Sequence, residues 1–219
     1  MNIGLILLSA TGLLILFGVG QRVLDRLRLT DRQAILFIVL IILGGLAPDI
    51  RVTERFAFNI GGALIPLALC VWLLVKADSG RERARALAAA LITAVAVFLL
   101  GRGLPEEPEA MLIDPGYAYG IAAGLIAYAL GRSRRGAFIA GTLGVMLADA
   151  GAWAYARAMG ADQRLVLGGA GAYDVTVIAG LLAVLLSELI GELLERLQRG
   201  RRKPVREFRN GDFVRREQP

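Results

Sequence analysis

The sequence contains no histidine, and its single cysteine, Cys70, lies inside an apolar run. A disulfide within one chain, a Ser-His-Asp triad and a zinc site built from Cys and His are therefore excluded. We expect no metal site and no cofactor. An internal repeat is also missing, and with it the inverted-repeat pattern that is typical of many transporters.

Apolar sequence, in contrast, is abundant. Of the 219 residues, 56% are hydrophobic, and several apolar runs are long enough to cross a bilayer of about 30 Å as helices. We predict an all-α fold, a polytopic transmembrane bundle of about seven helical spans. The expected spans are Ile3–Val19, Asp31–Ala47, Phe56–Val75, Ala84–Leu100, Tyr117–Leu130, Ala137–Tyr155 and Leu165–Leu194.

The cationic residues predict the orientation of these spans. Twenty of the 25 Lys and Arg residues fall in the tail and in the connectors after the first, third and fifth spans. The positive-inside rule then places the N-terminus outside and the C-terminus in the cytoplasm, in the inner or plasma membrane. Residues 1–195 form the expected transmembrane domain. If the second span were a re-entrant loop instead, everything after it would be inverted.

Residues 196–219 are expected to form a basic cytoplasmic tail. This tail includes Arg201, Arg202 and Lys203, and each charge near a membrane surface contributes about 1 kcal/mol of attraction to anionic lipid. The lipid bilayer, with anionic lipid at the tail, is the predicted partner. Anionic lipid is enough to explain the net charge of +6, so we do not expect nucleic acid as a partner.

Two acids inside the predicted spans are the candidate functional groups. An ionisable residue at membrane depth costs at least about 2.5–3.5 kcal/mol on insertion. Asp149 and Asp174 are each expected about 12–14 Å below the outer surface, on antiparallel spans joined by a short loop. Small residues such as Gly144 and Gly168 would let these helices approach closely. The alternative is that these are ordinary packing surfaces and that each acid only bonds a neighbouring group.

Two facing carboxylates would share one proton, as an aspartyl hydrolase requires. We therefore predict catalytic roles for Asp149 and Asp174 in an intramembrane aspartyl protease or hydrolase acting on a membrane peptide. The glycine-rich stretch "GGAG" would let a substrate backbone come close. The residues expected to bind substrate are Asn59, Gly169, Gly171 and Tyr173, with Asn59 on the wall of an outward-facing polar cavity floored by the two acids.

Other interpretations of the same acids stay open. Asp174, Glu188 and Glu192 share one face of a helix, so that a relay through Glu188 would suit a transporter or channel for protons or cations. In a third interpretation the acids only hold helices together in a structural membrane protein. Whether the chain is an enzyme is undecided from the residues alone.

Three stretches resemble a known family when taken together: "LAPDIRVTERFAFNIGGALIP", "DPGYAYGIAAGLIA" and "GGAGAYDVTVIAG". They are similar to prokaryotic multi-pass membrane proteins grouped as domain of unknown function 1614, a resemblance that implies no activity. Tyr173-Asp174 also resembles one motif of the presenilin and signal-peptide-peptidase class of intramembrane aspartyl proteases. It stands on the later span, however, and Gly171 is followed by Ala172 where the second motif of that class has Asp.

Overall fold

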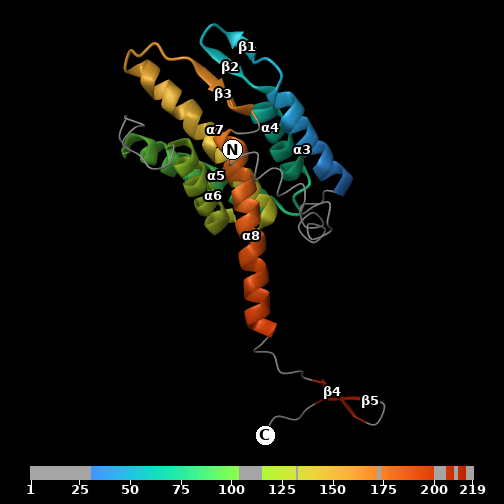
Figure 1. Ribbon diagram of the computed structural model, residues 1–219. Helices are drawn as coiled ribbons and strands as arrows, with labels where there is room; N and C mark the ends of the chain where they lie inside the picture. The colour runs from blue at the N-terminus through green and yellow to red at the C-terminus, as the bar shows by residue number, and fades with distance from the viewer. Residues whose placement is uncertain are drawn as a thin grey trace. The chain divides into compact units, whose positions relative to one another are not determined.

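The computed structural model describes residues 31–103, 115–131, 133–171, 174–199, 206–209 and 212–215. These residues are mostly helical and include two small sheets. The chain divides into two compact units, Met1–Ser187 and Glu188–Pro219. Figure 1 traces the order of their elements along the chain.

The first unit combines helices with a small three-stranded sheet. Its helices are α3 (Asp31–Gly45), the π-helix η1 (Ile60–Leu64), α4 (Ile65–Val75), α5 (Gly80–Gly103), α6 (Pro115–Gly131), α7 (Arg134–Ala158) and the first part of α8 (Val175–Arg199). Its strands are β1 (Ile50–Thr53), β2 (Phe56–Phe58) and β3 (Leu165–Leu167).

Within the described residues, α5 and α7 are long and apolar enough to cross a membrane, as judged by length and composition. Ile35–Gly45, Ile60–Val75 and Val175–Ser187 are shorter apolar helices. Six of the predicted spans thus overlap helices in the structure: α3, α4, α5, α6, α7 and α8. The predicted span Ile3–Val19 lies outside the described residues.

Small residues bring the helices of the first unit into close contact around α7, which packs against α4, α5 and α6. An alanine cluster lies among these helices: Ala89, Ala127, Ala137, Ala140 and Ala183. A Cβ added at Gly141 would lie 2.8 Å from the carbonyl oxygen of Ala179 on α8. The expected contact through Gly144 is different, because Gly144 meets Thr93 of α5.

Two predicted spans begin as strands. Phe56–Phe58 is β2 and Leu165–Leu167 is β3, so helical structure starts only at Ile60 and at Val175 respectively. The reason is pairing between remote segments: β2 pairs antiparallel with β1 and parallel with β3. Backbone groups that bond across a sheet cannot also bond along a helix, so these corrections shorten both expected spans.

The sheet has two different faces, which follow from its register. Residues opposite one another share a face, and one row consists of Ile50, Phe58 and Leu167. Phe56 lies on that same face, and its ring is 6.0 Å from the ring of Trp153 on α7. The apolar face therefore packs on α7. The adjacent row, Arg51, Ala57 and Val166, belongs to the opposite face.

The N-terminal end of α7 is held by an ion-pair network. Arg135 lies 2.7 Å from Asp78 Oδ2 and 3.4 Å from Glu82 Oε1, and its side chain is 11% exposed. Its guanidinium also donates to the carbonyl oxygen of Lys76 at 2.9 Å. Ser133 caps the helix by accepting from the N–H of Gly136 at 3.0 Å. This network ties α7 to the connection between α4 and α5.

The second unit contains the end of α8 and a two-stranded sheet of β4 (Arg206–Arg209) and β5 (Asp212–Arg215). The strands are antiparallel, with Phe208 opposite Phe213. α8 continues past residue 195, where the tail is predicted to begin, and ends at Arg199.

Candidate functional site

Asp149 lies on α7, four residues before Trp153, and is half-buried. Among the residues that the structure describes, none donates a hydrogen bond to its carboxylate and no cation pairs with it. The cations near this end of α7 have other partners. Arg102 lies over the ring of Tyr155 at 4.4 Å, and Arg157 lies over that of Trp153 at 5.2 Å. Asp149 is thus an acid in the middle of an apolar helix without compensation of its charge.

Asp174 lies at the start of α8 rather than within it, and it acts as the N-terminal cap of that helix. Its Oδ1 accepts from the N–H of Thr176 at 2.9 Å, and its Oδ2 accepts from the N–H of Ala170 at 3.3 Å. Its carbonyl oxygen accepts the first helical bond, from Ile178 at 3.0 Å. A carboxylate in this position satisfies free N–H groups and complements the helix dipole. Helix capping is therefore one reason for an acid at position 174.

The two carboxylates are within electrostatic range of one another, and the charge of Asp174 acts on Asp149. The close contact between α7 and α8 agrees with this proximity, because Gly141 lies against the backbone of Ala179 and Gly180 lies against the side chain of Thr142. Like charges that act on one another disfavour simultaneous ionisation, and this favours a pair that holds one proton between its members. The arrangement thus provides one proton donor and one acceptor.

Asn59 is 3% exposed, and its side-chain amide is engaged within the chain. Its Oδ1 accepts from the N–H groups of Gly61 at 2.9 Å and Gly62 at 3.0 Å. Its Nδ2 donates to Asp49 Oδ1 at 3.0 Å and to the carbonyl oxygen of Ala47 at 3.4 Å. These bonds join the end of α3, the end of β2 and the start of η1. Asn59 thus positions the elements around the site.

The stretch before Asp174 is a loop. Gly168 and Gly171 have φ of +69° and +60°, which glycine adopts without strain. Neither glycine could be replaced by a residue with a side chain. A Cβ at Gly168 would collide with the backbone of Gly62, and a Cβ at Gly171 would lie 2.9 Å from Gly45. Gly169, by contrast, is exposed. The expectation of a helical contact surface here is wrong, since backbone meets backbone in a turn.

Several predicted site residues fall beyond what the structure describes. Tyr173 lies outside the described residues, as do Arg201, Arg202 and Lys203. Glu188 belongs to α8, but its side chain is also outside the described part. No group of three or more potential metal ligands occurs among the described residues.

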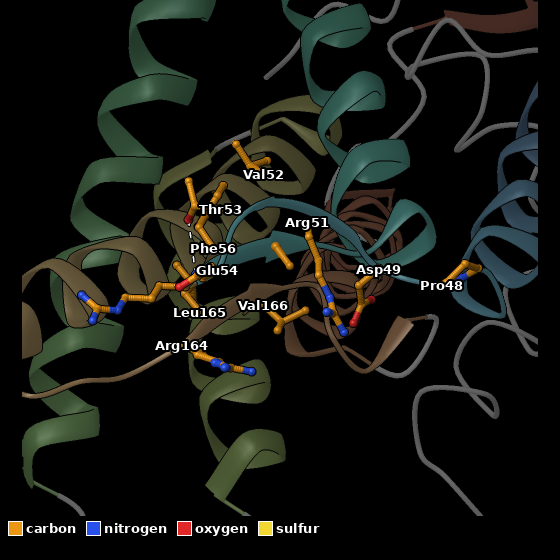
Figure 2. A pocket seen from close by; sticks show the side chains of 12 residues that line it. Pro48, Asp49, Arg51, Val52, Thr53, Glu54, Phe56, Arg164, Leu165 and Val166 are labelled. Atoms are coloured by element: carbon orange, nitrogen blue, oxygen red, sulfur yellow. Dashed lines mark hydrogen bonds between the residues drawn. The ribbon is translucent and has the colours of Figure 1, made fainter.

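A pocket of about 860 Å³ lies over the sheet, at a place that the sequence analysis did not single out. Its lining comes from the segment before β1, the three strands and the residue before β3, and includes the charged side chains Asp49, Arg51, Glu54, Arg55 and Arg164. Figure 2 shows these residues, except Arg55, with their labels. The alternation of polar and β-branched residues in "DIRVTERF" is the sequence signal that could have indicated this sheet.

Comparison with known proteins gives one match. A family model described as Protein of unknown function (DUF1614) matches residues 23–186, most of the chain. No curated protein and no solved structure matches the sequence.

Proposed function

The chain belongs to the DUF1614 family, and we propose that it is an intramembrane aspartyl hydrolase, with a membrane peptide as its substrate. The observation that carries this proposal is the electrostatic contact between Asp149 and Asp174. Two further facts support it. One acid lies on a helix long enough to span a bilayer, and neither acid has a cationic partner among the described residues.

The hydrogen bonds assign different roles to the two acids. Asp174 accepts from the N–H of Thr176 in the first turn of α8 and from the N–H of Ala170 in the preceding loop, which suits the carboxylate that takes a proton from water. Asp149 has no such donor, and it would carry the shared proton and donate it to the scissile carbonyl oxygen. The water oxygen then bonds to the carbonyl carbon. When the C–N bond breaks, the amine leaves with the proton from Asp174, and one hydroxyl of the tetrahedral intermediate returns its proton to Asp149 as the carboxylic acid forms.

The experiment is a search for new peptide N-termini in membranes that contain the wild-type protein, by chemical labelling and mass spectrometry. Asp149→Asn and Asp174→Asn should each abolish these termini while the protein still inserts. Asn is as good a helix cap as Asp, so Asp174→Asn removes the charge and spares the cap. The matched control is Asp162→Asn, an exposed acid that pairs with Arg55. Cleavage that survives in either pair variant would refute the proposal.

A proton- or cation-coupled transporter or channel is the second candidate. It is supported by three buried hydroxyls, those of Thr93, Thr142 and Thr176, which have no hydrogen-bond partner among the described residues. They lie on α5, α7 and α8, and they add polar groups to a bundle that already contains Asp149. Glu188 would extend this set along α8.

Flux through proteoliposomes separates this candidate from the hydrolase. A transporter should carry protons or cations down an imposed gradient, as read by a pH-sensitive dye, and Asp174→Asn should stop this flux. The control is again Asp162→Asn. Absence of flux under every gradient would reject transport, and would leave the hydrolase and the structural role, in which the acids only hold helices together.

The proposal includes seven spans with the N-terminus outside. The charge bias of the connectors supports this topology. Single cysteines at Thr53, in β1, and at Ser79, between α4 and α5, test it in a Cys70→Ser background. A membrane-impermeant maleimide should label the first in intact cells and the second only after permeabilisation. The reverse pattern would mean that the orientation is inverted.

A further inference from the structure

On the polar face of the sheet, two arginines lie beside the smaller side chains of Ala57 and Val166. Arg51, Ala57 and Val166 form one row across the three strands. Arg164 precedes β3 and stands two residues before Val166, which puts it on the same face. All four residues line the pocket of about 860 Å³. Figure 2 shows the side chains of Arg51 and Arg164 on either side of Val166.

The charges of this pocket are only partly neutralised within the chain. Arg55 pairs with Asp162 at 2.9 Å, and Asp49 accepts a hydrogen bond from Asn59. Glu54 belongs to the turn between β1 and β2, and Figure 2 shows it beside Thr53. Arg51 and Arg164 are left without an ion pair among the residues that the structure describes. Two exposed guanidinium groups thus lie in one hollow without a direct ion pair, and the carboxylates of Asp49 and Glu54 line the same hollow.

We propose that this face binds a phosphate group between Arg51 and Arg164, above Ala57 and Val166. Strands lie about 4.8 Å apart, so Arg51 and Val166 on the outer strands are separated by about 10 Å, a gap that two arginine side chains can close from opposite sides. The planar guanidinium donates two parallel hydrogen bonds to phosphate oxygens. The small side chain of Ala57 in the middle of the row leaves room for the anion.

The phosphate could belong to a lipid headgroup or to a soluble molecule. Two exposed apolar side chains line the pocket as well: Val52 is 57% exposed and Val166 40%. Such residues beside two arginines suit the boundary between headgroups and acyl chains. This site differs from the aspartate pair, because neither Asp149 nor Asp174 lines the pocket.

The test uses the full chain in nanodiscs and compares two double variants. Arg51→Gln/Arg164→Gln removes the two guanidiniums, and Arg81→Gln/Arg85→Gln removes two exposed charges from α5 as a matched control. In the first arm, inorganic phosphate is titrated by calorimetry into protein held in phosphatidylcholine. In the second arm, native mass spectrometry counts phosphatidylglycerol molecules that stay bound to protein released from mixed nanodiscs.

Wild type and the control should bind the probe equally in at least one arm. The Arg51→Gln/Arg164→Gln variant should lose roughly tenfold or more in affinity, as expected when charged hydrogen bonds are removed. Binding in the phosphate arm alone identifies a soluble anion, and binding in the lipid arm alone identifies a headgroup. The proposal is overturned if wild type binds neither probe, or if both double variants lose affinity equally. Peptide cleavage by the aspartate pair is measured separately, so the two proposals can fail independently.

Discussion

At one end of α7, the buried guanidinium of Arg135 meets the carboxylates of Asp78 and Glu82, whereas towards the other end Asp149 has no cation or hydrogen-bond donor among the described residues, and the charge of Asp174 acts on it. The first arrangement compensates its charges and satisfies its hydrogen bonds. The second leaves like charges together. Structures that serve stability tend towards the first kind, and functional sites tolerate the second at a cost in stability. One helix thus separates a structural end from a candidate reactive end.

The largest effect should come from breaking the compensated end. Arg135→Ala leaves Asp78 and Glu82 close together without a cation, and we expect a loss of about 2–4 kcal/mol, reduced from the value for a fully buried pair because Asp78 is half-exposed. Thermal unfolding in detergent measures it. Arg85→Ala, an exposed arginine on α5, is the control and should change stability by less than about 0.5 kcal/mol. Equal melting temperatures for both variants would mean that the network contributes nothing.

A smaller effect should appear at Asp174, where capping and charge can be separated. Asp174→Ala removes the side-chain cap of α8 and should cost about 1 kcal/mol. Asp174→Asn retains a capping oxygen, so its unfolding free energy should stay within a few tenths of a kcal/mol of wild type. Equal destabilisation by both substitutions would show that the charge itself, and not the cap, stabilises the helix start.

The opposite sign is expected at Asp149. Asp149→Asn removes a carboxyl group whose ionisation is opposed by the charge of Asp174, and it should raise the free energy of unfolding by about 0.5–1 kcal/mol. A double-mutant cycle with Asp174→Asn checks the cause. The gain should disappear when Asp174 is already neutral. A gain that is unchanged in that background would mean that the two carboxylates do not interact.

The smallest effect on stability should come from Thr142→Val, which replaces an unpartnered buried hydroxyl with a methyl group. Removing such a group should change stability by about 0.5 kcal/mol or less. The functional readout decides between the two candidates. Peptide cleavage should be unaffected in this variant, whereas ion flux, if the bundle conducts, should fall. Thr142→Ser, which retains the hydroxyl, is the control.

Hydrophobic pattern was enough to predict the helices but not the sheet. The predicted spans Ala84–Leu100 and Ala137–Tyr155 fall within α5 and α7, because an apolar run of this length has few other ways to satisfy its backbone. β2 and β3 contain three residues each. Strands this short carry too few residues to show their own period, and the partner that decides their structure is remote in sequence.

The candidate sites show the same difference between features that depend on residues close in sequence and features that depend on remote pairing. The pairing of Asp149 and Asp174 was predicted from antiparallel neighbours joined by a short connection. The charge of Asp174 acts on Asp149, and the direct approach of the two carboxylates stays a prediction. The capping role of Asp174 was missed because its helix was expected to begin at Leu165. The arginine pocket was missed because the registration of Arg51 with Val166 depends on β2, which was read as helix.

The glycine contacts around the sheet also set an order of events during synthesis. Gly61 and Gly62 pack against Gly45 and Gly168, and the last of these comes from the second half of the chain. The junction cannot close until the ribosome has made that half and β3 has paired with β2. Until then, the apolar surfaces of the helices that are synthesised before β3 stay unpacked at this junction, where chaperones or lipid can bind them. The turn "LGGAG" in the second half of the chain is therefore needed before the first half can finish packing.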